Sequence, residues 1–202
     1  QTVLMSGLEG PWDMAFLDDG TMFFTEKCRG LSVRLPSGEV KPLLGMVRSS
    51  GFDNIAYDLF CEGQAGMMGV AVDPDFASNR RIYVMSTSSL TAPASNRVMR
   101  LEVSEGLDAV SNRTDIVADI PFKPRSSAHP FGGPGAHNGG RVRFNPGDGF
   151  LYVTTGDTHN GVVPQSPTLM GGKVLRIDTD GNAAAGNGAP DGFDARIFTY
   201  GH

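Results

Sequence analysis

The chain contains 202 residues, of which 40% are hydrophobic, and its 17 Lys and Arg against 22 Asp and Glu give a net charge of −5. This length and hydrophobic share are enough to bury the core of a folded domain, which excludes a disordered chain. The basic residues form no run of the kind that nucleic-acid binding requires, and no apolar run approaches the roughly 18 residues that cross a bilayer, so we expect a small-molecule partner.

Turn-forming residues divide the chain into many short segments, because 27 glycines and 13 prolines are scattered along it. The first group of segments predicts strands at residues 11–16, 22–26 and 31–35, with a turn at 18–20. A fourth strand is predicted at 39–44. Short strands joined by tight turns indicate an antiparallel meander.

The same order of strands and turns recurs twice further along. The second copy predicts strands at 69–72, 81–85, 97–103 and 114–118, and the third predicts strands at 141–144, 150–155, 173–178 and 196–200. Repeated four-stranded meanders are typical of propeller blades. We therefore predict an all-β fold, a β-propeller of four-stranded antiparallel blades, in which residues 1–202 form about three blades of a single domain.

A propeller closes its ring with about four to eight blades, because each blade buries both faces against neighbours. Three blades would leave two faces uncovered. We therefore expect the same domain to continue beyond His202.

Cys28 and Cys61 are the two cysteines of the chain. They are too few and too far apart for the paired spacing of a structural zinc site. We predict that they form one disulfide. The alternative is two unrelated buried thiols, as expected in a reducing compartment.

The densest candidate for chemistry is a glycine-rich segment, residues 129–141, which places His137 just before a predicted strand. Asp157 follows the end of the next strand, and in a hairpin that position lies beside the start of its partner. A carboxylate there would orient the imidazole and leave its other nitrogen free to accept a proton. The alternative is that His137 only ends a loop and Asp157 only makes a turn. The chain has no Gly-x-Ser-x-Gly turn, which argues against a serine hydrolase.

Six motifs occur in an order that resembles the soluble glucose/sorbosone dehydrogenases that use pyrroloquinoline quinone. These motifs are residues 63–71, 73–76, 137–141, 152–157, 171–177 and 200–202. The resemblance implies a six-bladed propeller of about twice this length, periplasmic or secreted, that oxidises a sugar at its anomeric carbon, or a related aldehyde, and reduces the quinone.

By the same resemblance His137 is the general base, Asp157 orients it and Gln64 contacts the sugar. The quinone-binding residues and the calcium-binding carbonyls would lie beyond His202. Ala136 departs from the best-known members, in which an acidic residue precedes the histidine, so the sugar preference is open. The resemblance does not identify the electron acceptor that reoxidises the quinone.

Other residues support weaker interpretations. Asp178, Asp180 and Asn182 have the first spacings of a calcium loop, but the glycine and closing glutamate of that loop are absent, so we predict a turn. His129 and His159 flank the proposed cleft and could bind substrate. We expect Trp12 to pack between blades.

Two rival functions remain from the sequence. One is a non-catalytic propeller that binds glycans or proteins through the same loops. The other is a calcium-dependent propeller lactonase, for which Glu26 and Asp73 are candidate channel acids that also fit ordinary turn or strand-end roles.

Overall fold

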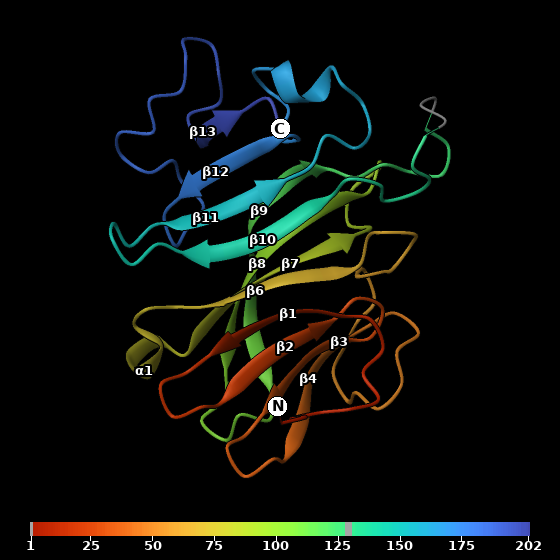
Figure 1. Cartoon of the computed structure of the whole chain (residues 1–202), viewed down its shortest axis with the longest axis vertical. Helices are drawn as coiled ribbons and strands as arrows, with labels where there is room; N and C mark the ends of the chain where they lie inside the picture. The colour runs from red at the N-terminus through yellow and green to blue at the C-terminus, as the bar shows by residue number, and fades with distance from the viewer. Residues whose placement is uncertain (1, 128–130) are drawn as a thin grey trace.

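The structure is a computed structural model that describes residues 2–127 and 131–202. Thirteen strands in these two ranges form three sheets that lie one beside the next, and the strands of each sheet follow chain order (Figure 1). Of the described residues, only two short segments are helical, and neither has the length or apolar character needed to cross a bilayer.

The first sheet, blade 1, is larger than predicted. Its strands are β1 (Pro11–Phe16), β2 (Met22–Glu26), β3 (Gly30–Arg34), β4 (Val40–Met46) and β5 (Ile55–Ala56). The first four pair antiparallel as predicted, and β5 pairs parallel to β4. The sheet is therefore five-stranded and mixed. A two-residue strand has no periodicity, so the sequence does not reveal β5.

The second sheet, blade 2, has longer strands than predicted. It consists of β6 (Met67–Val72), β7 (Arg81–Ser88), β8 (Ser95–Val103) and β9 (Val110–Pro121), all antiparallel. The pairing of β8 with β9 shifts register at three places. These bulges interrupt the alternation of apolar residues, which explains why only the middle of β9 was predicted. The turn after β6 continues into a single helical turn, α1 (Phe76–Asn79).

The third sheet, blade 3, follows the prediction to within two residues at each strand end. Its antiparallel strands are β10 (Gly139–Phe144), β11 (Leu151–Thr155), β12 (Lys173–Ile177) and β13 (Ile197–Tyr200). A short 3₁₀ turn, η1 (Val163–Gln165), lies between β11 and β12.

The core consists of two apolar layers, one on each side of blade 2. Ile82 and Val84 of β7 belong to the layer shared with blade 1, and Tyr83 and Met85 belong to the layer shared with blade 3. Successive side chains of a strand point to opposite faces. The sequence of a strand that is buried on both faces is therefore a continuous run of apolar residues. This is the packing of a propeller blade between its neighbours, and the predicted fold class is confirmed.

Asp13 joins the first strands of all three blades. Its carboxylate, on β1, accepts a hydrogen bond of 3.1 Å from the backbone N–H of Val70 on β6. The same carboxylate pairs with Arg143 on β10, at 2.6 and 2.8 Å, and with Arg141. The Arg141 guanidinium also lies over the ring of Trp12, which packs against the layer between blades 2 and 3, as predicted.

Candidate active site

His137 and Asp157 lie side by side at one end of blade 3. Residue 139 at the start of β10 pairs with residue 155 at the end of β11, so the segments just outside this pair face each other. Nδ1 of His137 lies 2.7 Å from Oδ1 of Asp157. Half of the His137 side chain is exposed to solvent.

The Asp157 carboxylate remains ionised over the pH range in which proteins usually work. Its partial burial alone would raise its pKa, but hydrogen bonds from the backbone N–H of His159 and from the His137 ring hold the pKa below the ordinary value. A carboxylate only accepts hydrogen bonds, so the proton of a neutral His137 ring resides on Nδ1. The other nitrogen, Nε2, is then a proton acceptor.

The backbone around this pair requires a glycine at position 156. A Cβ atom there would lie 1.8 Å from the carbonyl oxygen of His137. The N–H of Gly156 donates to the carbonyl of Asn138 over 2.9 Å, and that of Thr158 donates to the carbonyl of His137 over 3.3 Å. His137 itself has a φ of 51°, in the left-handed region that side chains rarely adopt. The two loops therefore hold each other in place.

Gln64, predicted from the resemblance to contact the sugar, lies against the backbone of His137. Its Oε1 accepts the backbone N–H of His137 at 3.2 Å, and its own backbone N–H donates to the carbonyl of Pro134 at 3.3 Å. Gly63 allows this approach, because a Cβ there would lie 2.1 Å from the Pro134 oxygen. Gln64 thus supports the loop that carries His137.

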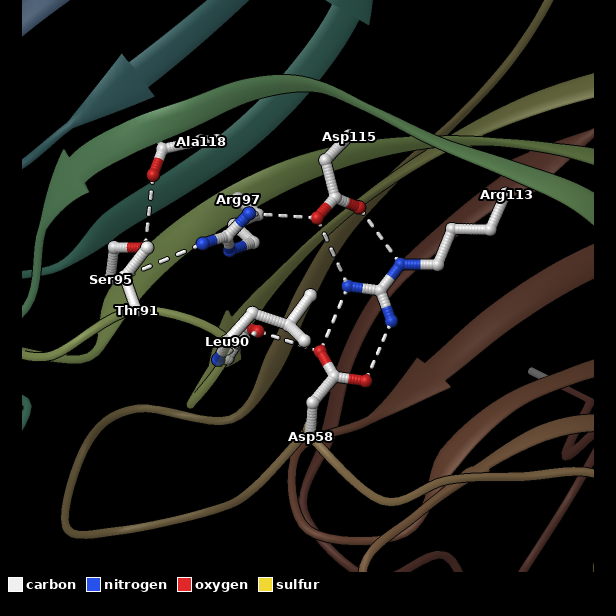
Figure 2. Close-up of polar contacts among 9 residues, drawn as sticks. Asp58, Leu90, Thr91, Ser95, Arg97, Arg113, Asp115 and Ala118 are labelled. Atoms are coloured by element: carbon white, nitrogen blue, oxygen red, sulfur yellow. Dashed lines mark hydrogen bonds and ion pairs between the residues drawn. The ribbon is translucent and has the colours of Figure 1, made fainter.

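A disulfide and an ion pair hold the segment before Gln64. Cys28 and Cys61 form a disulfide with their Cα atoms 5.1 Å apart, as predicted. Asp58 makes two parallel hydrogen bonds, 2.8 and 2.9 Å long, to the guanidinium of Arg113 on β9. Figure 2 shows this guanidinium between the carboxylates of Asp58 and Asp115.

A row of aromatic rings continues from His137. The His159 ring lies 4.4 Å from the His137 ring, centroid to centroid, and the Phe131 ring lies 5.8 Å beyond it. His159 therefore lies beside the His137–Asp157 pair. His129, the other flanking histidine, lies outside the described residues.

Two buried asparagines that hold the His137 loop in place were not predicted from the sequence. Asn96 on β8 donates to the side-chain oxygen of Asn138 over 2.8 Å. Asn138 immediately follows His137. Asn96 lies in a strand that also contains serine, arginine and glutamate residues, so its sequence neither singles it out as buried nor indicates a partner 42 residues away.

Two buried lysines near the site donate hydrogen bonds from their ammonium groups to backbone carbonyls. Lys173 donates to the carbonyls of Val163, Pro164 and Gly171 over 2.9 to 3.0 Å, and its burial lowers its pKa. Lys123 donates to the carbonyl of Phe131.

The acidic residues weighed as calcium ligands accept hydrogen bonds from within the chain. Asp178 accepts the backbone N–H groups of residues 180 and 182, which makes the predicted turn. Glu26 accepts the N–H of residue 9, and Asp73 accepts the hydroxyl of Tyr83. Across residues 2–127 and 131–202, no three His, Cys, Asp or Glu side chains are grouped to hold a metal ion.

The chain also resembles solved structures. The quinone-bound aldose sugar dehydrogenase of Streptomyces coelicolor superposes with a TM-score of 0.80 at 26% identity, covering 100% of this chain and 53% of that one. The soluble aldose sugar dehydrogenase of Escherichia coli in its apo form has a TM-score of 0.76 at 27% identity, covering 98% of this chain and 53% of that one.

Sequence comparison gives relatives with names of the same kind. The chain is 29% identical over 203 residues to an aldose sugar dehydrogenase of Escherichia coli (strain K12), covering 98% of this chain and 50% of that protein. It is 27% identical over 227 residues to quinoprotein glucose dehydrogenase B of Acinetobacter calcoaceticus, covering 99% and 43%. The chain thus spans about half the length of these relatives. Since residues 8–202 match the sequence model for glucose/sorbosone dehydrogenases, the chain belongs to the glucose/sorbosone dehydrogenase family.

Proposed function

We propose that this chain carries the proton-accepting part of a sugar dehydrogenase that oxidises an aldose, or a related sugar aldehyde, with pyrroloquinoline quinone. The observation that carries the proposal is the pairing of His137 with Asp157, which leaves Nε2 of a half-exposed imidazole free to accept a proton. Relatives named as quinoprotein and aldose sugar dehydrogenases support the reaction class.

In the proposed reaction, Nε2 of His137 accepts the hydroxyl proton at the anomeric carbon of the sugar. Loss of this proton makes the neighbouring C–H bond a hydride donor, and the carbon–oxygen bond becomes a carbonyl as the hydride leaves. When bound, the quinone supplies the electrophilic carbonyl that takes the hydride. The Asp157 carboxylate stabilises the imidazolium that forms on His137 and keeps Nδ1 directed toward itself.

We assign the described residues His137, Asp157 and Gln64 to the sugar side of such a site. Pyrroloquinoline quinone also carries carboxylates, which require cations, and the nearby Lys123 and Lys173 already direct their ammonium groups to backbone carbonyls. We therefore propose that the groups that hold the quinone and the Ca²⁺ ion lie beyond His202, in further blades that complete the propeller. A periplasmic or secreted location is part of the proposal, and the Cys28–Cys61 disulfide supports it.

The test uses the full-length protein loaded with pyrroloquinoline quinone and Ca²⁺, a panel of aldoses and a dye that accepts electrons. Wild type should reduce the dye, and His137→Ala should lose a factor of about 10² to 10⁴ in turnover because it lacks the proton acceptor. Quinone absorbance measures cofactor loading in each protein. A loaded wild type that reduces no dye with any aldose contradicts the proposal. Sugar binding without dye reduction would favour a glycan-binding propeller, and Ca²⁺-dependent lactone hydrolysis would favour a lactonase.

A further inference from the structure

Three buried polar side chains form a continuous row from the interior of blade 2 to the loop that carries His137. Thr87 on β7 and Asn96 on β8 have no exposed surface, and Asn138 is 5% exposed. The hydroxyl of Thr87 lies 2.7 Å from Oδ1 of Asn96, and Nδ2 of Asn96 lies 2.8 Å from Oδ1 of Asn138. Nδ2 of Asn138 lies 2.5 Å from the carbonyl oxygen of Gly135.

The surrounding carbonyls determine the orientation of both amides. Nδ2 of Asn96 faces the carbonyl of Pro121 at 2.9 Å, and Nδ2 of Asn138 faces the carbonyl of Gly135. A carbonyl oxygen only accepts hydrogen bonds, so an NH₂ group must face it in each case. Oδ1 of Asn96 consequently faces Thr87, whose hydroxyl donates to it. Neither amide can rotate by half a turn without placing two acceptors against each other.

The row ends on the residues that flank His137. Gly135 is held from one side by Asn138, and its own N–H donates to the carbonyl of Lys123 over 2.8 Å. The backbone carbonyl of Asn138 accepts the N–H of Gly156, next to Asp157. Residues 135–138 are therefore attached to blade 2 through Asn138 and to the Asp157 loop through the backbone.

We propose that Asn96 and Asn138 are positioning residues, whose buried amide–amide hydrogen bond connects His137 to blade 2 and sets the direction of its imidazole. The inference rests on the proposed function, because it concerns the residue that accepts the proton there. Both members of the pair lie at the end of blade 3, but only the loop that carries His137 is also held by blade 2, through Asn138. Loss of the Asn96–Asn138 bond should shift His137 relative to Asp157 without removing either side chain.

Turnover, substrate affinity and stability distinguish positioning from a purely structural role. Asn96→Ala and Asn138→Ala remove the bond from either side, and Asn138→Asp keeps an acceptor for Asn96 but loses the donor to Gly135. The matched control is Asn187→Ala. Nδ2 of Asn187 donates to the backbone carbonyls of Arg176 and Ala195, and its Oδ1 accepts from the Arg176 guanidinium, at the other end of β12.

We expect all four variants of the full-length protein to fold, with similar falls in Tm. In dye reduction with the quinone-loaded enzyme, kcat should fall on the order of 10- to 100-fold for the three site variants, with KM within about threefold of wild type, because a misplaced base impairs the chemical step. Asn187→Ala should keep the wild-type kcat. A kcat within about threefold of wild type in the site variants, at a Tm equal to that of the control, would overturn the inference.

A second measurement requires no turnover. In quinone-free protein labelled with ¹⁵N-histidine, the ring shifts of His137 report which nitrogen holds the proton. Wild type should show the Nδ1–H form, and the three site variants should show a mixture of both forms. An inactive wild type would contradict the proposed function, whereas unchanged ring shifts in the site variants would contradict the positioning role.

Discussion

Gly156 and His137 approach so closely that a Cβ atom on residue 156 would lie 1.8 Å from the carbonyl oxygen of His137. Backbone atoms cannot move aside as the end of a flexible side chain can. The contact therefore couples the loop that carries the proposed base to the loop that carries its carboxylate partner.

Replacing Gly156 by Ala should separate these two loops. We expect a destabilisation of about 1–3 kcal/mol from the forced backbone shift and a fall in turnover on the order of 10²-fold. The control is Gly161→Ala, where an added Cβ meets no atom within 4 Å, so stability should stay within about 0.5 kcal/mol. Urea unfolding and dye reduction measure the two effects. Equal behaviour of the two variants would show that the loops are not coupled.

Replacing Asp157 by Asn should keep the shape of the pair and remove its charge. The imidazolium of His137 then loses its stabilising partner and the tautomer is no longer imposed, so turnover should fall on the order of 10²- to 10⁴-fold with little change in KM. Asp180→Asn, which removes a carboxylate from the exposed pair with Arg100, should leave turnover unchanged. Steady-state dye reduction measures the turnover of both variants. An Asp157→Asn enzyme as active as the Asp180→Asn control would exclude the orienting role.

The Asp58–Arg113 pair should make stability depend on pH in a defined range. Burial alone would raise the pKa of Asp58, but hydrogen bonds from Arg113 and Ser88 hold it below the ordinary value. A carboxyl whose pKa is lower in the folded state contributes stability that is complete above the unfolded pKa of about 3.9 and is lost as the pH falls through the folded value.

The urea midpoint of wild type should therefore exceed that of Asp58→Asn by a constant amount at neutral pH, and the difference should shrink below about pH 4. Asp18→Asn, an exposed turn residue, serves as the control. If the difference between wild type and Asp58→Asn does not shrink in acid, the pair does not contribute stability through this carboxylate.

The Cys28–Cys61 disulfide should stabilise the segment that leads to Gln64. It closes a loop between cysteines 33 residues apart, and the chain-entropy argument gives a contribution of about 3–4 kcal/mol. Replacing both cysteines by Ala should lower the free energy of unfolding by about this amount, and adding a reductant to wild type should have the same effect. Urea unfolding with and without reductant measures it. A wild type insensitive to reductant, with two thiols that alkylate before reduction, would contradict the bond.

The sequence by itself determined the blades and the pairing of His137 with Asp157. Strand and turn signals are local, so all four strands of blade 3 are found within two residues of their predicted ends. The two site residues flank the open end of one hairpin, so they lie close together even though a bulge shifts the register between positions 139 and 142.

The tertiary structure alone decided which blade supports which residue. Asp13 meets Arg143, 130 residues away, and Asp58 meets Arg113, 55 residues away, because separate blades pack together. The same packing brings Asn96 to Asn138 and turns Gln64 toward the backbone of His137. A polar side chain shows in the sequence only that it needs a partner when buried, and the choice of partner depends on the arrangement of the whole core.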